Sequence, residues 1–258
     1  MNSGIRLERG EVTTITLDRP DAANAFDRTT LRMFAETVWT IADASDVRAV
    51  VVTGAGSKAF CAGADLKERG GMSIDEVRDY IHTIRDILTS LERLPQPVVA
   101  AINGSAFGGG CELALACDIR VMADDAWIGL TETGLGIIPG AGGTQRLPRL
   151  VGRGRGIELI ATARRVDAAE ALEIGLVQDV VPPGEVLGRA KEIAETIAGN
   201  APVAVRAAKE AVLRGLEMPI DDALQLETEL YERTLGTKDR LEGLAAFRER
   251  RPPRYTGE

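Results

Sequence analysis

Two glutamates, each beside a run of glycines, are the residues of this sequence best suited to chemistry. The first, Glu112, directly follows the glycine-rich segment 103–111. Glycines let the backbone approach a ligand closely, and glycines that open a helix leave N–H groups free at its positive end. Such N–H groups can bind a carbonyl oxygen that gains negative charge. Glu112 could then be a base, although a helix cap and a close helix–sheet turn remain the structural alternatives.

The second glutamate, Glu132, precedes another glycine-rich segment, residues 134–144. It stands between Leu130 and Leu135 in a largely uncharged stretch, where a purely solvated role is less natural. Two carboxylates beside a site that polarises a carbonyl group can handle a water molecule and a proton. The sequence therefore predicts acid–base chemistry by carboxylates.

Other catalytic groups are scarce. The single histidine, His82, excludes any mechanism that needs two histidines in one chain and the common His-rich zinc sites. There is no His-Glu-x-x-His, Gly-x-Ser-x-Gly or Gly-Lys-Ser/Thr motif. His82 falls in a predicted helix, so we interpret it as a residue of the helix surface or a partly buried one. Cys61 adjoins a glycine loop, but a thiol nucleophile needs a cationic partner, and we interpret this residue as packing.

A third glycine-rich segment, residues 54–59, follows a predicted strand and superficially matches the dinucleotide fingerprint. That fingerprint requires a helix directly after it and an acid at a strand end about 20 residues on. Here Gly63 interrupts the helix, and Asp75 and Glu76 stand at a helix start instead. The sequence therefore argues against nucleotide binding of the Rossmann kind.

The composition is that of a globular protein with a full core. The chain has 258 residues, of which 45% are hydrophobic and 27% charged, and no apolar run reaches membrane-spanning length. The N-terminal residues 1–6 lack the pattern of a secretory signal. Three cysteines without a Cys-x-x-Cys pair indicate reduced thiols, so we expect a cytoplasmic protein. The net charge of −8 disfavours nucleic acid and anionic lipid as partners.

The elements that must position the two glutamates alternate between strands and helices. The patterns predict a hairpin over 4–17, a helix over 28–44 and buried strands at 49–53 and 98–102. They also predict a capped helix over 74–94, a short helix over 109–117 and strands at 119–122 and near 177–181. After residue 143 the chain becomes mostly helical, with a second capping box at 167–170. Three helices are expected after Asn200, followed by an irregular basic tail.

Three blocks of this sequence, together with the tail, resemble the enoyl-CoA hydratase (crotonase) family. They are residues 59–67 (AFCAGADLK), residues 108–120 (GGGCELALACDIR) and Glu132 with residues 138–147 (IPGAGGTQRL). The tail segments 237–243 and 251–255 also fit. Together with residues 61–69, the tail looks most similar to the methylglutaconyl-CoA hydratase branch, whose mammalian member also binds AU-rich RNA.

The resemblance implies an α/β fold: a crotonase-type spiral of ββα units over residues 1–200 that contains the CoA site. It implies a C-terminal helical region, residues 201–258, that assembles the chain as a trimer or a dimer of trimers. The backbone N–H groups of Ala64 and Gly109 would bind the thioester oxygen. Glu112 would accept the proton of water, and Glu132 would supply the proton that reaches the α-carbon. The expected substrate and CoA contacts are Ala59, Ala62, Gly63, Ala64, Asp65, Leu66, Lys67 and Gly109.

The resemblance thus implies reversible addition of water to a 2-enoyl-CoA, an acyl-CoA thioester, because family members with both glutamates are typically hydratases. No metal or redox cofactor is expected, since coenzyme A arrives as part of the substrate. An isomerase or hydrolase on the same fold, and the methylglutaconyl-specific reaction, remain alternatives. RNA binding is a remote one, because residues 46–54 lack the basic stripe that it would need. A distal carboxylate on the acyl group would need a cation such as Lys67, Arg69 or Arg85.

Overall fold

The fold is built around two β-sheets that the chain visits in turn. A computed structural model describes residues 4–258. The expectation that residues 1–6 contain no secretory signal therefore falls partly outside the described residues. Among these residues the larger sheet has six strands in the order β1-β2-β3-β5-β7-β10. They are β1 (Gly4–Glu8), β2 (Val12–Asp18), β3 (Ala49–Gly54), β5 (Val98–Ile102), β7 (Ile119–Ala123) and β10 (Asp179–Val181). β1 and β2 form the expected hairpin, and the other neighbours pair in parallel.

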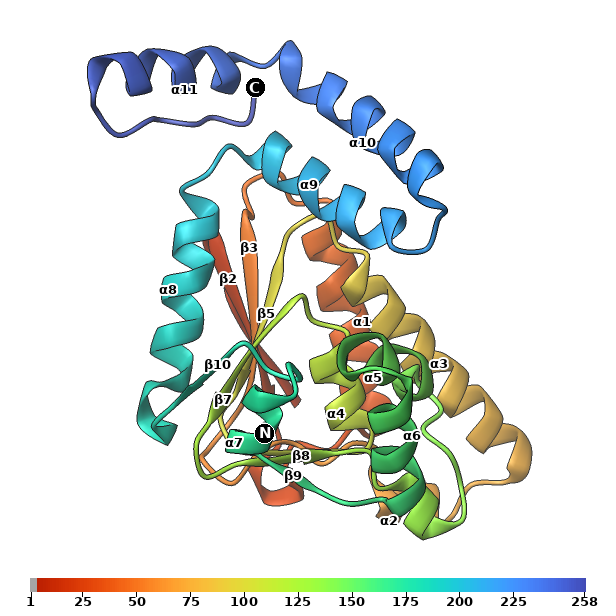
Figure 1. Ribbon diagram of the computed structural model, residues 1–258. Helices are drawn as coiled ribbons and strands as arrows, with labels where there is room; N and C mark the ends of the chain where they lie inside the picture. Colours follow the sequence, from red (N-terminus) through yellow and green to blue (C-terminus); the bar gives the residue numbers. More distant parts are fainter. Residues whose placement is uncertain (1–3) are drawn as a thin grey trace.

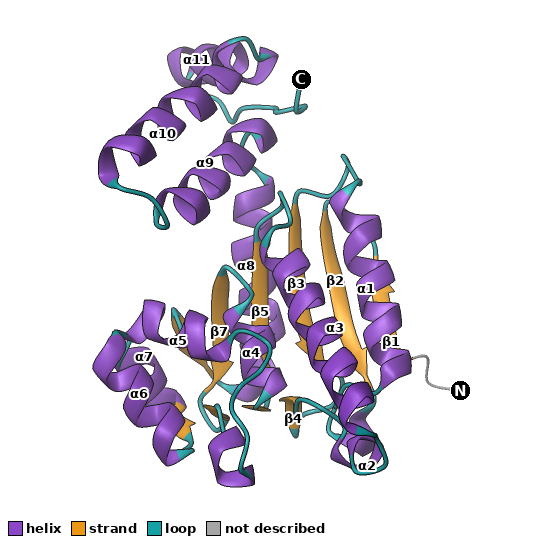
Figure 2. Ribbon diagram, turned by 90° about the vertical axis from the view of Figure 1, so that its right-hand side faces the viewer, coloured by secondary structure: helices purple, strands orange, loops and turns teal. Residues whose placement is uncertain are grey.

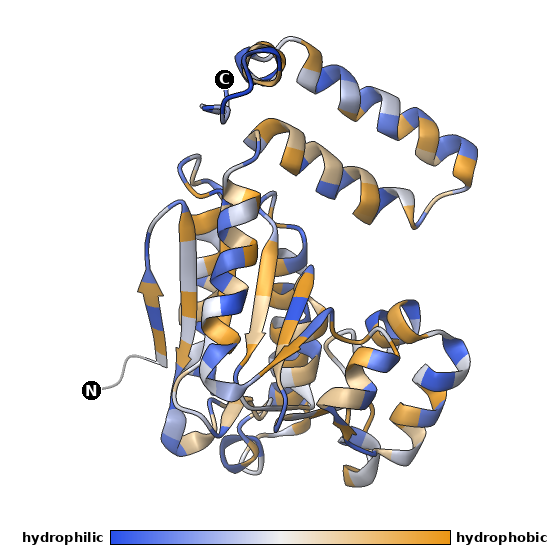
Figure 3. Cartoon of the chain, turned by 60° about the vertical axis from the view of Figure 1, so that its left-hand side comes forward, coloured by the Kyte–Doolittle hydropathy of each residue, from blue (hydrophilic) through white to orange (hydrophobic). Residues whose placement is uncertain are grey.

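The apolar runs in the centre of this sheet fold as strands because both of its faces are covered. Every residue of β3 and β5 is buried, as expected for parallel strands between helical layers. The helices α1 (Arg28–Ala42) and α3 (Ile74–Glu92) lie on one side, and α8 (Val186–Ala198) lies on the other (Figure 1). Figure 3 shows the apolar residues concentrated along these strands.

A smaller sheet lies below the first and consists of very short strands in the order β4-β6-β8-β9. They are β4 (Ala59–Cys61), β6 (Ser105–Phe107), β8 (Trp127–Gly129) and β9 (Val166–Asp167). β4, β6 and β8 run parallel to one another, whereas β9 is antiparallel to β8. The chain therefore repeats one unit: a long strand of the large sheet, a short strand of the small sheet, and a helix. This is the spiral of ββα units that the resemblance implied.

The remaining helices of the core cover the lower half of the molecule (Figure 2). They are α2 (Leu66–Arg69), α4 (Gly109–Leu115), α5 (Gly143–Val151), α6 (Arg153–Thr162) and α7 (Ala168–Glu173), with the 3-10 turns η1 (Pro20–Ala22), η2 (Glu132–Leu135) and η3 (Pro183–Glu185). The predicted capping box of α3 is present, since Ser73 accepts from the Glu76 N–H and Glu76 accepts from the Ser73 N–H.

The second expected capping box is only half formed. Asp167 accepts a hydrogen bond from the Glu170 N–H and so caps α7. The Glu170 carboxylate, however, accepts from Arg164 at 2.6 and 2.8 Å instead of returning to the Asp167 N–H. A charged partner offers a stronger hydrogen bond than a neutral backbone group, which explains the difference.

The last three helices form an arm that extends from the core, as Figures 1 and 2 show. They are α9 (Pro202–Gly215), α10 (Ile220–Leu235) and α11 (Lys238–Glu249). Ala207, Leu226 and Leu230 form a small core between α9 and α10. Large apolar side chains of the arm are nevertheless exposed, including Leu216, Ile220 and Phe247. Among residues 4–258, none of the helices combines the length and apolar character that crossing a bilayer requires.

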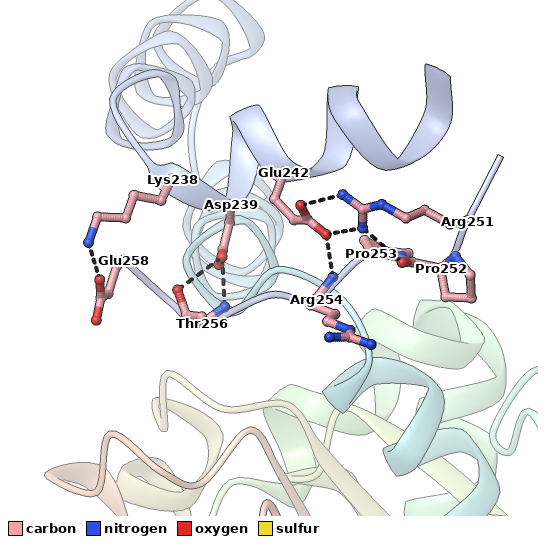
Figure 4. A pocket seen from close by; sticks show the side chains of 9 residues that line it. All are labelled: Lys238, Asp239, Glu242, Arg251, Pro252, Pro253, Arg254, Thr256 and Glu258. Carbon is pink, nitrogen blue, oxygen red and sulfur yellow. Dashed lines mark hydrogen bonds and ion pairs between the residues drawn. The ribbon is translucent and has the colours of Figure 1, made fainter. Parts of the chain in front are cut away.

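The irregular tail, residues 250–258, folds back along α11. Buried Asp239 accepts hydrogen bonds from the N–H groups of Thr256 and Gly257 at 2.7 and 2.8 Å. Glu242 binds both Arg251, through two hydrogen bonds, and the Arg254 N–H (Figure 4). A hollow of about 930 Å³ lies between helix and tail. Because these side chains already pair with one another, we attribute the hollow to packing of the tail and not to a ligand.

Candidate active site

The predicted site residues meet because three short parallel strands end at one edge of the small sheet. β4 leads into Gly63 and Ala64, β6 into Gly108 and Gly109, and β8 into the turn that begins at Glu132. The carboxyl ends of neighbouring parallel strands lie side by side. The sheet therefore brings together residues that are between about 20 and 70 positions apart in the sequence.

Two backbone N–H groups, those of Ala64 and Gly109, lie beside each other at this edge. A Cβ atom placed on Gly63 would lie 2.7 Å from the Gly109 nitrogen, and one placed on Gly109 would lie 3.6 Å from the Ala64 nitrogen. Gly63 also has φ of +85°, a conformation that side chains disfavour. Gly109 is the first residue of α4, so its N–H has no acceptor within the helix. The two N–H groups thus lie where the sequence predicts a site for an oxygen that gains negative charge, and that role stays a prediction.

The loop that carries Ala64 is held by a short bridge to Phe26. The Phe26 N–H donates to the Gly63 carbonyl at 2.8 Å, and the Asp65 N–H donates to the Phe26 carbonyl at 2.8 Å. This pattern pairs Phe26 with Ala64 but uses the groups on either side of Ala64. The Ala64 N–H itself makes no hydrogen bond within residues 4–258. The bridge thus fixes the direction of the Ala64 N–H but leaves this group available to donate to a ligand.

Glu112 is held rigidly in the first turn of α4. Its side chain is buried, with 3% of its surface exposed. One carboxylate oxygen, Oε1, accepts hydrogen bonds from the N–H groups of Ala141 and Gly143, both at 2.8 Å. Burial raises the pKa of Glu112, whereas the two N–H groups and the charge of Arg146 act in the opposite direction. One oxygen is therefore anchored and the other is left to act on a ligand.

Glu132, unlike Glu112, has a buried carboxylate oxygen that lacks a hydrogen bond among the described residues. Its Oε2 atom is buried without a hydrogen-bond partner in the described part of the chain. A Cβ on Gly108 would lie 3.3 Å from Glu132 Oε1, so the glutamate packs against the backbone that precedes Gly109. Burial, followed by the negative charge of Glu112, raises the pKa of Glu132 to about 7. Such a carboxyl group can hold or release a proton near neutral pH.

The residues expected to contact CoA take different places. Ala62, Leu66 and Lys67 are exposed, and Lys67 forms no ion pair within residues 4–258. Ala59 is buried in β4, and its carbonyl accepts a hydrogen bond from Asn24 at 2.7 Å. Asp65 caps α2 and pairs with Arg19 at 3.1 Å. Ala62, Leu66 and Lys67 are thus accessible to a ligand, whereas Ala59 and Asp65 make contacts within the protein.

The remaining candidates of the sequence occupy structural positions. His82 is exposed on α3, as expected for a residue of the helix surface. Cys61, Cys111 and Cys117 are all buried and free, and burial raises the pKa of the Cys61 thiol to about 12. Cys61 is thus neutral at pH 7, in agreement with a packing role.

The segment considered for RNA binding is largely inside the protein. Residues 49–54 are the buried strand β3. Arg48, the one cation of that segment, donates to the carbonyls of Ala198 and Tyr255 at 3.0 and 2.8 Å. Its charge serves the contact between core and tail.

Sequence reasoning did not identify the groups that orient Glu112. These are the N–H groups of Ala141 and Gly143 and the side chains of Arg146 and Glu92. The glycine-rich segment 134–144 was the available signal, because backbone N–H donors converge on an oxygen where glycines permit tight turns. That Glu112 accepts these hydrogen bonds depends on tertiary packing, which the sequence pattern does not contain.

The spiral of ββα units with two acids beside two N–H donors defines the class of the protein, and comparisons identify the family. The family model "Enoyl-CoA hydratase/isomerase" matches residues 8–258. The chain belongs to the enoyl-CoA hydratase/isomerase family.

Individual relatives agree. The crystal structure of an enoyl-CoA hydratase from Bacillus anthracis superposes with a TM-score of 0.97 at 52% identity, covering 99% of this chain and all 100% of that one. The short-chain-enoyl-CoA hydratase of Clostridium acetobutylicum is 46% identical over 97% of this chain and 96% of that protein. The mitochondrial methylglutaconyl-CoA hydratase of Mus musculus is 43% identical over 97% of this chain and 81% of that protein.

Proposed function

We propose that this protein is an enoyl-CoA hydratase that reversibly adds water to a 2-enoyl-CoA and produces a 3-hydroxyacyl-CoA. The observation that carries the proposal is the pair Glu112 and Glu132, two carboxylates with different environments beside the N–H groups of Ala64 and Gly109. The similarity to the short-chain-enoyl-CoA hydratase of Clostridium acetobutylicum and to the enoyl-CoA hydratase of Bacillus anthracis supports the proposal.

In the proposed reaction the N–H groups of Ala64 and Gly109 bind the thioester oxygen. Glu112, anchored through Oε1, accepts a proton from water while the water oxygen bonds to the β-carbon. The electron pair of the double bond moves toward the thioester and places negative charge on its oxygen. Each fixed donor at such an oxygen is typically worth about 2.7–4 kcal/mol in the transition state.

Glu132 then supplies the proton that the α-carbon accepts, and the enolate collapses to the product. A carboxyl group with a pKa of about 7 is suited to this step, because it is protonated in a large share of molecules at neutral pH. Transfer of the water proton from Glu112 to Glu132 restores both groups. The protein needs no metal or redox cofactor in this scheme, since coenzyme A is part of the substrate.

A methylglutaconyl group is a second candidate substrate because one cation lies near Glu132. The charge of Arg69 acts on the Glu132 carboxyl group, and Arg69 forms no ion pair within residues 4–258. Arg85, in contrast, is exposed and pairs with Asp86. Of the cations considered from the sequence, Arg69 is thus the one we propose for a distal acyl carboxylate.

Hydration assays with crotonyl-CoA, a long-chain 2-enoyl-CoA and methylglutaconyl-CoA test these proposals. We expect loss of the conjugated thioester absorbance with crotonyl-CoA. A selective loss of methylglutaconyl-CoA turnover in Arg69→Gln would favour the second substrate. Shift of the double bond of a 3-enoyl-CoA without hydration would instead make the protein an isomerase and overturn the proposal.

We also propose that the chain works as a homo-oligomer, a trimer or a dimer of trimers. Leu216 and Phe247 of the arm expose 80% and 87% of their surface. Apolar exposure of this extent is costly in water and is relieved when symmetric copies bury it. A cytoplasmic location remains a prediction from the sequence.

A further inference from the structure

The loop that anchors Glu112 has its own support, which the chemistry described so far does not include. Residues 139–143 turn sharply through Gly142, whose φ is +107°. The N–H groups on both sides of Gly142, those of Ala141 and Gly143, bind Glu112 Oε1. A shift of this turn would therefore displace the carboxylate directly.

Arg146 fixes the turn from the next residues of the chain. It lies in the first turn of α5, and its Nη1 donates to the Ala141 carbonyl at 2.9 Å. A Cβ atom on Gly142 would lie 2.1 Å from the same Nη1, so the guanidinium group fills the space that a side chain would need. Ala141 thus donates its N–H to Glu112 and accepts a hydrogen bond from Arg146 at its carbonyl oxygen.

Glu92 in turn fixes Arg146. Its two carboxylate oxygens accept from Arg146 Nε and Nη2 at 2.9 and 2.8 Å, a bidentate geometry. Only 12% of the Arg146 side chain is exposed, against 30% for Glu92. Charge-assisted bidentate pairs of this kind are strong and directional. The pair connects the last residue of α3 to the turn that holds Glu112.

Arg149, one turn further along α5, provides the contrast. It pairs with Glu217 at 2.9 Å, but both side chains are more than half exposed, at 54% and 58%. Its guanidinium group also binds the Gln145 carbonyl of its own helix and not the 139–143 turn. The two arginines thus lie on the same helix and each pairs with a glutamate, but only Arg146 contacts the turn.

We propose that Arg146 and Glu92 are positioning residues that hold the Ala141–Gly143 turn and thereby aim the Glu112 carboxylate at its substrate. Neither side chain touches the reacting atoms. The inference rests on the proposed function, in which Glu112 accepts the proton of water. In this arrangement α3, which contributes no catalytic group, takes part in setting the geometry of the base.

The first test is the steady-state kinetics of Arg146→Lys and Glu92→Gln, with Arg149→Gln as matched control. A displacement of about 1 Å can cost on the order of a hundredfold in rate, so we expect kcat for crotonyl-CoA to fall at least about tenfold in both variants. KM should stay close to the wild-type value, because the thioester oxygen is bound by Ala64 and Gly109. Arg149→Gln should retain wild-type kinetics.

The second test separates a positioning role from a merely structural one. If Arg146 acts through Glu112, then Arg146→Lys should cost little in the Glu112→Gln background, because coupled residues are not additive. An undiminished tenfold loss in that background would overturn the inference. If Arg146→Lys does not fold, Glu92→Gln carries the same cycle, since it keeps the arginine and weakens only the bidentate pair that fixes it.

The pH profile gives an independent readout. The charged and titratable groups around Glu112 are Arg146 on α5, Glu132 on η2 and Cys111 on α4. Arg146 and the two N–H donors favour the ionised form of Glu112, so weakening them should move the acidic limb of kcat to higher pH. An unmoved limb with lower kcat would contradict the inference. If Glu112→Gln alone keeps wild-type activity, the proposed function fails instead.

Discussion

Glu112 and Glu132 are chemically identical side chains that the protein places in different environments. Glu112 has two N–H donors on one oxygen, whereas Glu132 has a buried oxygen without a partner. Desolvation favours the neutral form of both. At Glu112 the two N–H donors and Arg146 oppose this effect, whereas at Glu132 the negative charge of Glu112 adds to it. Pairs of acids whose environments separate their pKa values are suited to serve as base and acid of one reaction.

Replacement of either glutamate by glutamine tests this division of roles. Glu112→Gln and Glu132→Gln should each lower hydration of crotonyl-CoA by at least about a hundredfold, the usual scale for a positioned acid or base. The folds should persist, because Gln keeps the shape and, at position 112, an oxygen for the two N–H donors. In the double variant the loss should be smaller than the product of the single losses, since both residues act on one water.

The same variants distinguish the two roles. With Glu132 changed, residual turnover should show slower delivery of solvent deuterium to the α-carbon. Affinity for a CoA product should be similar in all variants, because the main chain binds its thioester oxygen. Near wild-type hydration by Glu112→Gln would exclude the paired-glutamate mechanism.

Glu132 should also make the stability of the protein depend on pH. Its folded-state pKa of about 7 lies above the usual 4.5, so the folded state binds the proton more tightly than the unfolded chain does. The contribution of Glu132 to stability is then present at low pH and is lost as pH rises through about 4.5 to 7. Thermal unfolding at pH 5 and pH 8 should show Glu132→Gln gaining stability relative to wild type at pH 8. An equal difference at both pH values would contradict this expectation.

At the scale of elements, the small sheet is what turns separate glycine segments into one site. β4, β6 and β8 are each three residues long, and α4 packs directly against the end of β4. The contact is so close that a Cβ on Gly110 would lie 1.9 Å from the Cys61 carbonyl oxygen. The oxygen belongs to the backbone of β4 and the position of the Cβ is set by the backbone of α4, so this contact can be relieved only if one of these elements shifts.

Gly110→Ala should therefore destabilise the protein by about 3 kcal/mol or more, the upper range for overpacking. Activity should fall as well, because the helix N-terminus must shift. Gly154→Ala is the matched control, since Gly154 is exposed in helix α6 and a Cβ there meets nothing within 4 Å. We expect that change to be neutral or to stabilise by about 0.5 kcal/mol. Urea unfolding of the two variants measures the difference, and equal midpoints would refute the assigned contact.

At the scale of the whole molecule, polar contacts fix the arm to the core while apolar side chains remain uncovered. Lys209 of α9 donates to Asp118 at 2.6 Å and to the Gln96 carbonyl at 3.0 Å, with 8% of its side chain exposed. Arg206 donates to the Val47 carbonyl at 3.2 Å. These contacts hold α9 against the core, while large apolar side chains of α10 and α11 stay exposed.

Sedimentation should reveal an assembly of at least three subunits. The apolar surface of the arm provides the driving force, so the combined change of Leu216→Asp and Phe247→Asp should shift the protein toward smaller species. Circular dichroism should remain unchanged, because both side chains are exposed in the single chain. A wild-type monomer of about 27 kDa at micromolar concentration would refute the proposed assembly.

Local patterns in the sequence were enough to locate most of the long elements. Val-rich runs predicted β3 and β5, and the spacing of apolar residues with Ser73 and Glu76 predicted α3 and its cap. The glycine segments and the two glutamates also stood out, because residue type alone restricts what such segments can do. The family resemblance extended this to the ββα spiral, which the structure confirmed.

Only the tertiary structure decided which of these pieces meet. Strands as short as β4, β6 and β8 have no periodicity to read and form because packing aligns them. The Arg146–Glu92 pair joins residues 54 positions apart, and the anchoring of Glu112 by Ala141 and Gly143 spans about 30. Local spacing fixes the conformation of a segment, but contacts across such separations depend on how the sheets and helices close around one core. The sequence determined the chemical groups, and the packing determined their geometry.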